Sequence, residues 1–226
     1  MISPPAVDHM VVLTHPSARS FCRSVARRWQ ARARRHNQVC EVRDLYHDRF
    51  DPVLKANEQP GKPGFSPAST IVAERRRLEK LDVLVFVYPV WFESPPAMLK
   101  GYLERVMGSG VAIRPEPQQR PLSSVRLVQI STSASSEPWL AERGIRGALE
   151  TLYDQYTAQV FGAREVYRLH LDSICVGMSR TRASNLLARV DDLADRVCAE
   201  ANVDRWNRTR TASSRRSRPI SADPPD

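Results

Sequence analysis

The residues best suited to binding chemistry form an aromatic segment in the middle of the chain. Tyr88 to Phe92 read YPVWF and follow an apolar run from Val83 to Val87. Such a run, rich in β-branched residues, is typical of a strand buried on both faces of a parallel sheet. Open parallel sheets bind ligands just beyond the carboxyl ends of their strands. The segment is therefore placed to hold a flat ligand, with packing in the core as the alternative role for Trp91 and Phe92.

A second segment lies where the first predicted strand runs into a helix. It reads THPSARSFC from Thr14 to Cys22. Backbone N–H groups and short hydroxyl side chains at a helix N-terminus form a natural phosphate site, although an ordinary cap would explain Ser17 or Ser20 alone. The glycine-rich motifs G-x-G-x-x-G and G-x-x-x-x-G-K do not occur. Cys22 and Arg28 also have the C-x5-R spacing of a phosphatase, a reading that the lack of loop glycines disfavours.

These segments need a fold that brings strand ends together, and the order of predicted elements provides one. Strand and helix patterns alternate along the chain, which is typical of right-handed βαβ units in one parallel sheet. We expect an α/β protein, a three-layer sandwich around a five-stranded parallel sheet. The predicted strands are 10–14, 39–45, 81–88, 124–130 and 163–169, and the predicted helices are 21–35, 69–80, 95–107, 138–159 and 181–201.

The 226 residues are enough for one domain, predicted over 8–202 after a short extension at 1–7. Residues 203–226 are basic and poor in apolar side chains, so we expect a disordered tail. The net charge of +9 owes much to arginines in 23–35 and 205–218. Such clusters could contact nucleic acid or acidic lipid. We favour a solvated tail, so nucleic acid is not the expected partner.

Several classes of protein are disfavoured by what the sequence lacks. The four cysteines form no C-x-x-C pair, which favours reduced thiols in a cytoplasm. No signal peptide is recognised, and no apolar stretch approaches the roughly 20 residues of a membrane span. The G-x-S-x-G motif of serine hydrolases is absent. No metal site is expected, because the histidines lack ligand spacing; those outside the loop are His9, His36, His47 and His170.

The aromatic segment resembles the flavin-binding turn of the flavodoxin-like NAD(P)H-dependent oxidoreductases, the quinone reductase family. The family pattern, YPVWW-small-x-PA-x-LKG-aromatic-x-x-RV, continues here through Lys100 to Val106. The loop at 15–22 is similar to the family's HP…SFN, with Cys22 in place of the asparagine. Residues 44–54 are similar to its DLY…FDPVL, which we interpret as structural and dimer-contacting. The segment 131–136, STSASS, stands where the family has TTGG.

The resemblance implies a flavodoxin-like fold that binds FMN, with FAD as the alternative, and takes electrons from NADPH or NADH. It implies hydride transfer through flavin N5 to a quinone or similar acceptor, no catalytic side chain, and a homodimer. A flavin-binding regulatory or ancillary subunit, for example of an ion-efflux system, is the alternative function. The implied phosphate contacts are His15, Ser17, Ser20, Phe21 and Cys22, and the implied ring contacts are Pro89, Val90, Trp91, Phe92, Glu93, Ser131, Thr132, Ser133 and Ala134.

Two further positions of the family are matched only in part. Some members carry a Tyr and a His in the helix after the segment 131–136. This chain has no Tyr between 131 and 152, and Arg146 stands in place of the histidine, so no catalytic pair is assigned. Arg182 falls where some members use an arginine against the cofactor's phosphates, and a surface arginine is the alternative for it.

Overall fold

The sheet at the centre of the molecule consists of five parallel strands in the order β2-β1-β3-β4-β5. The computed structural model describes residues 6–108 and 122–216. Strands β3 and β4 are paired residue by residue along their whole length, so that Pro89 at the end of β3 lies beside Thr132 at the end of β4. The strands are β1 (Asp8–Leu13), β2 (Val39–Asp44), β3 (Val83–Pro89), β4 (Arg126–Thr132) and β5 (Glu165–Leu171).

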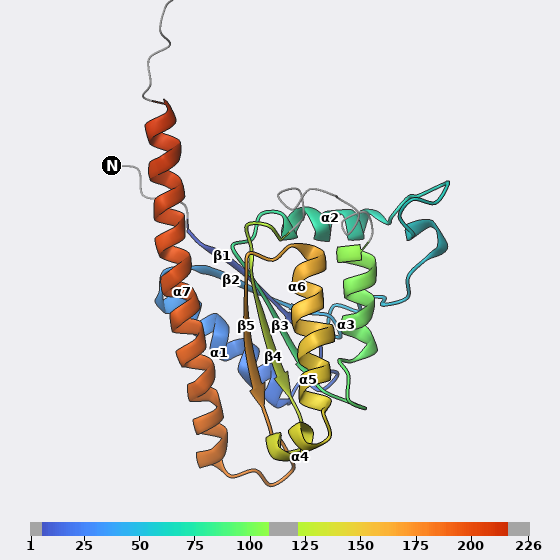
Figure 1. Ribbon diagram of the computed structural model, residues 1–226, viewed down its shortest axis with the longest axis vertical. Coiled ribbons are helices and arrows are strands. Elements are labelled where there is room, and N and C mark those ends of the chain that lie inside the picture. Colours follow the sequence, from blue (N-terminus) through green and yellow to red (C-terminus); the bar gives the residue numbers. More distant parts are fainter. Residues whose placement is uncertain (1–5, 109–121, 217–226) are drawn as a thin grey trace, which may run out of the picture.

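Helices cover both faces of this sheet, as Figure 1 shows. One face packs against α1 (Phe21–Arg35) and α7 (Arg180–Arg216), and Trp29 is fully buried there. The other face carries α2 (Ser69–Leu78), α3 (Ala97–Tyr102) and α6 (Tyr156–Phe161), with Tyr102 and Phe86 in its core. The predicted three-layer α/β sandwich with a five-stranded parallel sheet is thus confirmed.

The strand order creates the crevice in which such sheets bind ligands. From β1 the chain moves outward to β2, then crosses back over β1 to β3 on the other side. The connections that follow β1 and β3 therefore leave the sheet on opposite faces, which opens a gap between their loops. The two loops singled out in the sequence are these two connections.

The predicted helices over 95–107 and 138–159 are each interrupted. After Pro96 caps α3, the chain passes into a π-helical turn, η2 (Leu103–Gly108). The second helix is divided at Gly144, whose φ of 71° is left-handed and breaks the helical path. Its pieces are α4 (Glu137–Glu142), α5 (Ile145–Leu149), a π-helical turn η4 (Glu150–Gln155) and α6.

The last helix is longer than predicted. α7 continues to Arg216, so residues 203–216, expected to be disordered, are helical. Asp204 pairs with Arg126 of β4 and with Arg164, and Arg205 pairs with Asp82 at 3.0 Å. Because these partners come from distant parts of the sequence, the composition of the tail could not reveal them. Residues 217–226, also predicted to be disordered, lie outside the described residues.

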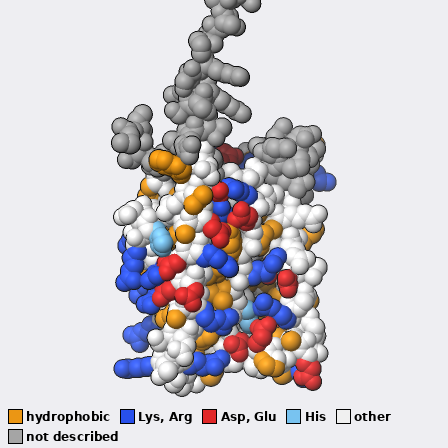
Figure 2. Space-filling model, turned by 60° about the vertical axis from the view of Figure 1, so that its left-hand side comes forward, with side chains coloured by type: hydrophobic (Ala, Val, Ile, Leu, Met, Phe, Trp, Pro, Cys, Tyr) orange, Lys and Arg blue, Asp and Glu red, His pale blue; other side chains and the backbone are white. Residues whose placement is uncertain are grey.

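The basic composition of α1 is offset in part by its neighbour. Arg28 and Arg32 of α1 make paired hydrogen bonds to Asp191 and Asp195 of α7. On the face that Figure 2 shows, Lys and Arg side chains are interspersed with Asp and Glu. Two of the six arginines of α1 thus join it to α7. Among the described helices, none is both long and apolar enough to cross a membrane.

The loop from 46 to 68 contains one short 3-10 helix, η1 (Ala56–Glu58), and is fixed to the sheet by buried contacts. Glu58 receives two hydrogen bonds of 2.6 Å from Arg105 of η2. Phe50 packs against Tyr102 with 5.5 Å between ring centroids. Pro52 lies directly against Gly101 of α3. These contacts agree with the structural part of the role predicted for residues 44–54.

Replacement of Gly101 by alanine is expected to destabilise the protein by about 1–3 kcal/mol, the usual cost of overpacking. The added methyl would lie 2.2 Å from the carbonyl oxygen of Pro52 and 2.4 Å from its Cβ, so the loop would have to move. Gly147→Ala in α5 is the matched control, because nothing lies within 4 Å of the added methyl there. The control should gain about 0.5–1 kcal/mol from lower chain entropy. Urea unfolding of both variants tests this, and equal stabilities would contradict it.

Candidate functional site

The aromatic turn after β3 has an unusual backbone. Trp91 and Ser94 close it with two hydrogen bonds, from Trp91 N to Ser94 O at 2.9 Å and from Ser94 N to Trp91 O at 3.1 Å. Phe92 and Glu93 between them have φ values of 49° and 60°, as in tight hairpin turns that usually require glycine or asparagine. This geometry turns the Phe92 ring fully into solvent and leaves Trp91 41% exposed. Glu93 is also exposed.

The loop after β1 is ordered by its own side chains. His15 Nδ1 accepts a hydrogen bond from Ser17 N, and Ser17 Oγ accepts one from Arg19 N, at 3.0 and 3.2 Å. Ser20 is the N-cap of α1, and its Oγ accepts from Arg23 N at 3.2 Å. No acidic residue lies in the first turn of this helix. A helix start of this kind presents N–H groups and the positive end of the helix dipole, which together favour an anion.

Cys22 does not point into this loop. Its side chain is 1% exposed, and its Sγ lies 3.3 Å from Thr132 Oγ1 of β4. Burial raises the pKa of the thiol to about 11. A protonated thiol directed into the core cannot act as a nucleophile, so the phosphatase reading of Cys22 and Arg28 is not supported. Only the backbone N–H of Cys22 could take part in anion binding.

The loops after β1 and β3 touch each other at their aromatic residues. The His15 and Trp91 rings meet edge to face, with 5.4 Å between centroids. Thr14 N donates to Val87 O at 3.0 Å and ties the first loop to the end of β3. Burial lowers the pKa of His15, with a smaller contribution from the charge of Arg23. The predicted phosphate loop and the predicted ring turn therefore lie side by side.

A third loop completes the site. The ring-edge loop, residues 131–136, faces the aromatic turn across a cavity of about 420 Å³. Val90 N donates to Thr132 O at 2.7 Å, which joins the start of the turn to the end of β4. Pro89, Ser131 and Thr132 lie in the strands themselves. The residues lining the cavity are Val90, Trp91, Phe92, Glu93, Ser133, Ala134, Ser135 and Leu140.

Sequence reasoning missed one residue beside this cavity. His170 of β5 is buried, and its Nδ1 and Nε2 lie 2.8 Å and 2.9 Å from the hydroxyls of Ser131 and Ser133. Burial is the largest cause that lowers its pKa. The predicted fifth strand ended at 169, one residue before it. Its place at the carboxyl end of a strand was the signal that could have identified it.

Two arginines singled out in the sequence lie at the margin of the site. Arg146 of α5 pairs with Glu137 at 3.5 Å. Arg182, in the first turn of α7, is exposed and approaches Asp172 at 3.4 Å. Both guanidinium groups thus have carboxylate partners.

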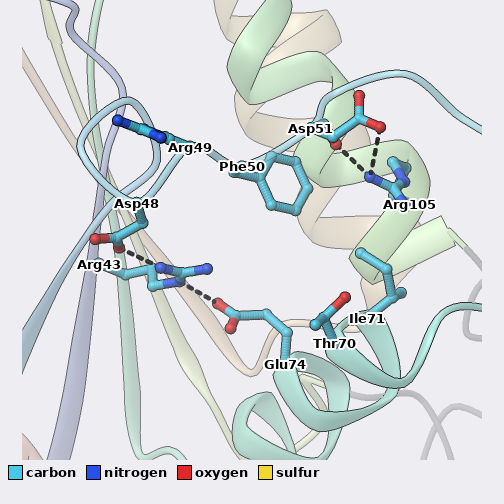
Figure 3. A pocket seen from close by; sticks show the side chains of 9 residues that line it. All are labelled: Arg43, Asp48, Arg49, Phe50, Asp51, Thr70, Ile71, Glu74 and Arg105. Atoms are coloured by element: carbon cyan, nitrogen blue, oxygen red, sulfur yellow. Dashed lines mark hydrogen bonds and ion pairs between the residues drawn. The ribbon is translucent and has the colours of Figure 1, made fainter.

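A second cavity, of about 350 Å³, lies beside β2 and is shown in Figure 3. Its walls carry ion pairs: Arg43 contacts both Asp48 and Glu74, and Arg105 contacts Asp51. Glu74 also accepts a hydrogen bond of 3.0 Å from the Tyr102 hydroxyl. These charges are matched within the wall, and their ion pairs hold the 46–68 loop in place. This cavity is therefore not the candidate site.

A parallel sheet in this order, with a cavity at the carboxyl ends of its central strands, defines the class of flavodoxin-like proteins. The chain belongs to this family: the family model described as "Flavodoxin-like fold" matches residues 8–194. The family resemblance stated from the sequence is thereby confirmed.

The relatives within the family are oxidoreductases by name. Over 147 residues the chain is 32% identical to a Haemophilus influenzae protein named "Uncharacterized NAD(P)H oxidoreductase", covering 63% of this chain and 72% of that protein. Over 162 residues it is 26% identical to "NAD(P)H dehydrogenase [quinone] 1" of Cavia porcellus, covering 63% of this chain and 59% of that protein. The match thus spans less than two thirds of the second relative.

Solved structures share the fold at lower identity. An NAD(P)H:quinone oxidoreductase from Methanothermobacter marburgensis has a TM-score of 0.72 at 22% identity, covering 84% of this chain and 96% of that one. An FMN-dependent NADH-azoreductase from Bacillus anthracis, in complex with FMN, has a TM-score of 0.63 at 15% identity, covering 84% and 99%.

Proposed function

We propose that this chain is a flavin-dependent NAD(P)H oxidoreductase that passes two electrons to a quinone or similar acceptor. The observation that carries the proposal is that two loops line one cavity and a third loop contacts them through the His15 and Trp91 rings. The helix start after β1, the aromatic turn after β3 and the ring-edge loop after β4 meet at the carboxyl ends of the strands. The names of the two curated relatives support the same activity.

The residues present fit a flavin. The cavity between Trp91 and Ala134 is open, and neither Ser20 nor the first turn of α1 brings a negative charge toward a phosphate. Loss of the family's asparagine at Cys22 leaves the backbone donor there in place. Glu93 is exposed on the turn rather than buried against the ring position. FMN is our first choice, with FAD as the alternative.

In this proposal the chain binds and orients, and the flavin, when bound, supplies hydride acceptance and donation at N5. Residues 15–22 hold the phosphate through hydroxyl and backbone donors. Trp91 shields one side of the ring, and the backbone of Val90 and of the ring-edge loop contacts its polar edge. Since the same cavity must receive nicotinamide and acceptor in turn, we expect ping-pong kinetics. Phe92, whose ring is exposed to solvent, could contact either the nicotinamide or the acceptor.

An absorption spectrum of the purified protein, taken after incubation with FMN or FAD and desalting, tests the proposal. Bound flavin bands that bleach with NADPH or NADH and recover on addition of a quinone would support it. A protein that retains neither flavin would contradict it. Tight flavin binding without turnover would favour the ancillary-subunit alternative.

We also propose that the chain forms a homodimer through an apolar groove between η2 and α6. This groove, of about 360 Å³, is lined mainly by apolar side chains, including Leu103, Val160 and Phe161. Leu152 and Tyr156 at its side are 59% and 61% exposed. Exposed apolar side chains gathered in one groove are typical of interaction surfaces. A second copy of the chain is the occupant that the family resemblance implies.

Leu152→Arg is expected to convert the dimer to a monomer, because it places a charge in the apolar lining of the groove. Light scattering coupled to size exclusion gives the mass directly. Val176→Arg is the control, since Val176 is fully exposed on a loop away from this groove and should leave the mass unchanged. A monomeric wild-type protein at micromolar concentration would contradict the proposal.

A further inference from the structure

A buried imidazole separates the candidate site from a third cavity, which is lined by charged side chains. His170 lines this cavity of about 250 Å³ together with Arg146, Arg168, Arg189, Glu137 and Asp172. Its hydrogen-bond partner Ser133 lines the candidate site on the other side. One side chain thus joins the two spaces.

The hydrogen bonds around His170 determine where its proton lies. Ser133 Oγ donates its single proton to Ser135 O at 2.8 Å, so it must accept from His170 Nε2–H at 2.9 Å. In the neutral imidazole Nδ1 then accepts from the Ser131 hydroxyl at 2.8 Å. Both ring nitrogens are used: one bond ends on Ser131 at the end of β4, and the other ends on Ser133 in the loop that follows.

The charges that act on the imidazole come from α4, α5, α7 and the loop after β5. The carboxylates of Glu137, 4.0 Å away, and of Asp172 favour protonation, and Arg146 and Arg189 oppose it. Burial outweighs all of them and lowers the pKa of His170, which keeps the ring neutral at neutral pH.

We propose that His170 is a positioning residue that holds the ring-edge loop in its binding conformation through Ser131 and Ser133. This inference rests on the proposed function of the site. The loop has serine and alanine where the family has glycines. Its backbone is tied at Ser133, whose N donates to Leu171 O at 3.1 Å and whose O accepts from Ile174 N at 2.8 Å. The imidazole adds the side-chain ties that keep the loop from closing or swinging outward, and a preorganised loop binds more tightly.

Nitrogen-15 NMR of the histidines in the full, ligand-free protein is the first test. We expect His170 at pH 7 to be the neutral tautomer protonated on Nε2, and its resonance to shift when FMN is added. His47, whose side chain is 79% exposed, is the internal control and should not shift. A tautomer protonated on Nδ1, or a His170 charged at pH 7, would overturn the inference whether or not flavin binds.

Two substitutions then separate positioning from packing. His170→Phe should weaken FMN binding at least tenfold, because it removes the bond to Ser133 in the loop and the bond to Ser131 at its base. His170→Gln, whose amide can donate to Ser133 and accept from Ser131, should restore the affinity to within about threefold of wild type, by the hydrogen-bonding capacity of an amide. Equal affinities of all three proteins, or a glutamine variant as weak as the phenylalanine variant, would overturn the inference.

The proposed function and this inference can fail separately. If the wild-type protein binds neither flavin, the proposed function fails, and hydrogen exchange still tests the inference. The amides of residues 131–136 should exchange at least tenfold faster in His170→Phe than in wild type or in His170→Gln. Unchanged exchange would show that the loop does not depend on His170.

Discussion

Replacing Ser20 with aspartate is expected to expel flavin from the protein while leaving the fold intact. Ser20 caps α1 by accepting a hydrogen bond from Arg23 N at 3.2 Å. Aspartate is as good an N-cap as serine, and its charge favours the helix start, so stability should not fall. The same charge would lie at the position proposed for the flavin phosphate. Two unit charges about 5 Å apart repel by roughly 3 kcal/mol at a protein surface, or about a hundredfold in affinity.

Ser20→Asn separates charge from shape, since asparagine caps a helix equally well and is neutral. We expect the asparagine variant to keep its FMN dissociation constant within a few fold of wild type, and both variants to keep the wild-type melting temperature or exceed it. Fluorescence titration and thermal unfolding on the same samples give both quantities. Stoichiometric FMN retained by Ser20→Asp would show that the phosphate does not bind at this helix start.

Glu58→Ala is expected to be the most destabilising single change among those considered, at about 3–5 kcal/mol. Glu58 is 1% exposed and receives both bonds of 2.6 Å from Arg105, which is itself buried. Removal of the carboxylate takes away the main partner of a buried guanidinium and loosens the 46–68 loop. Urea unfolding, with limited proteolysis to locate the released segment, would measure the effect.

The control for Glu58→Ala is Glu104, the residue next to Arg105 in the π-helical turn η2. Glu104 forms an exposed pair with Lys100, at 2.5 Å, and Glu104→Ala should cost no more than about 0.5 kcal/mol. The pair with Arg105 holds the pKa of Glu58 below its ordinary value of 4.5. Its stabilisation is therefore present above pH 4.5 and is lost as the pH falls further. Equal losses in the two variants would contradict a special role for the buried pair.

Most of the fold could be predicted from local patterns. The strand Val83–Pro89 is an unbroken apolar run buried along its whole length, and α1 begins and ends where its cap and its apolar spacing indicate. The interruptions of the later helices could not be predicted in the same way. A glycine such as Gly144 can also lie within a helix. Its left-handed φ of 71°, which breaks the helix here, is known only from the structure. The continuation of α7 depends likewise on ion pairs with residues 40 to 123 positions away.

The candidate site divides along the same line. The loops at 14–22, 88–93 and 131–134 were predicted from sequence, and the structure brings them together. The direction of individual side chains could not be predicted. Cys22 points into the core and Phe92 into solvent, because one lies on the buried side of α1 and the other in a left-handed turn. His170 is brought beside the site by the pairing of β4 with β5, which no local pattern of the sequence predicts.

The last turns of α7 offer a place at which this protein can be attached to a surface. Figure 1 shows that the helix runs past the sheet at the end opposite to α4, the helix that adjoins the candidate site. Val203, just before the ion pairs that Asp204 and Arg205 make at this end of the sheet, is 59% exposed. A cysteine introduced there, with the exposed native Cys175 replaced by serine, would attach the molecule to an electrode or a bead through α7. The candidate site would then face the solution in every immobilised copy.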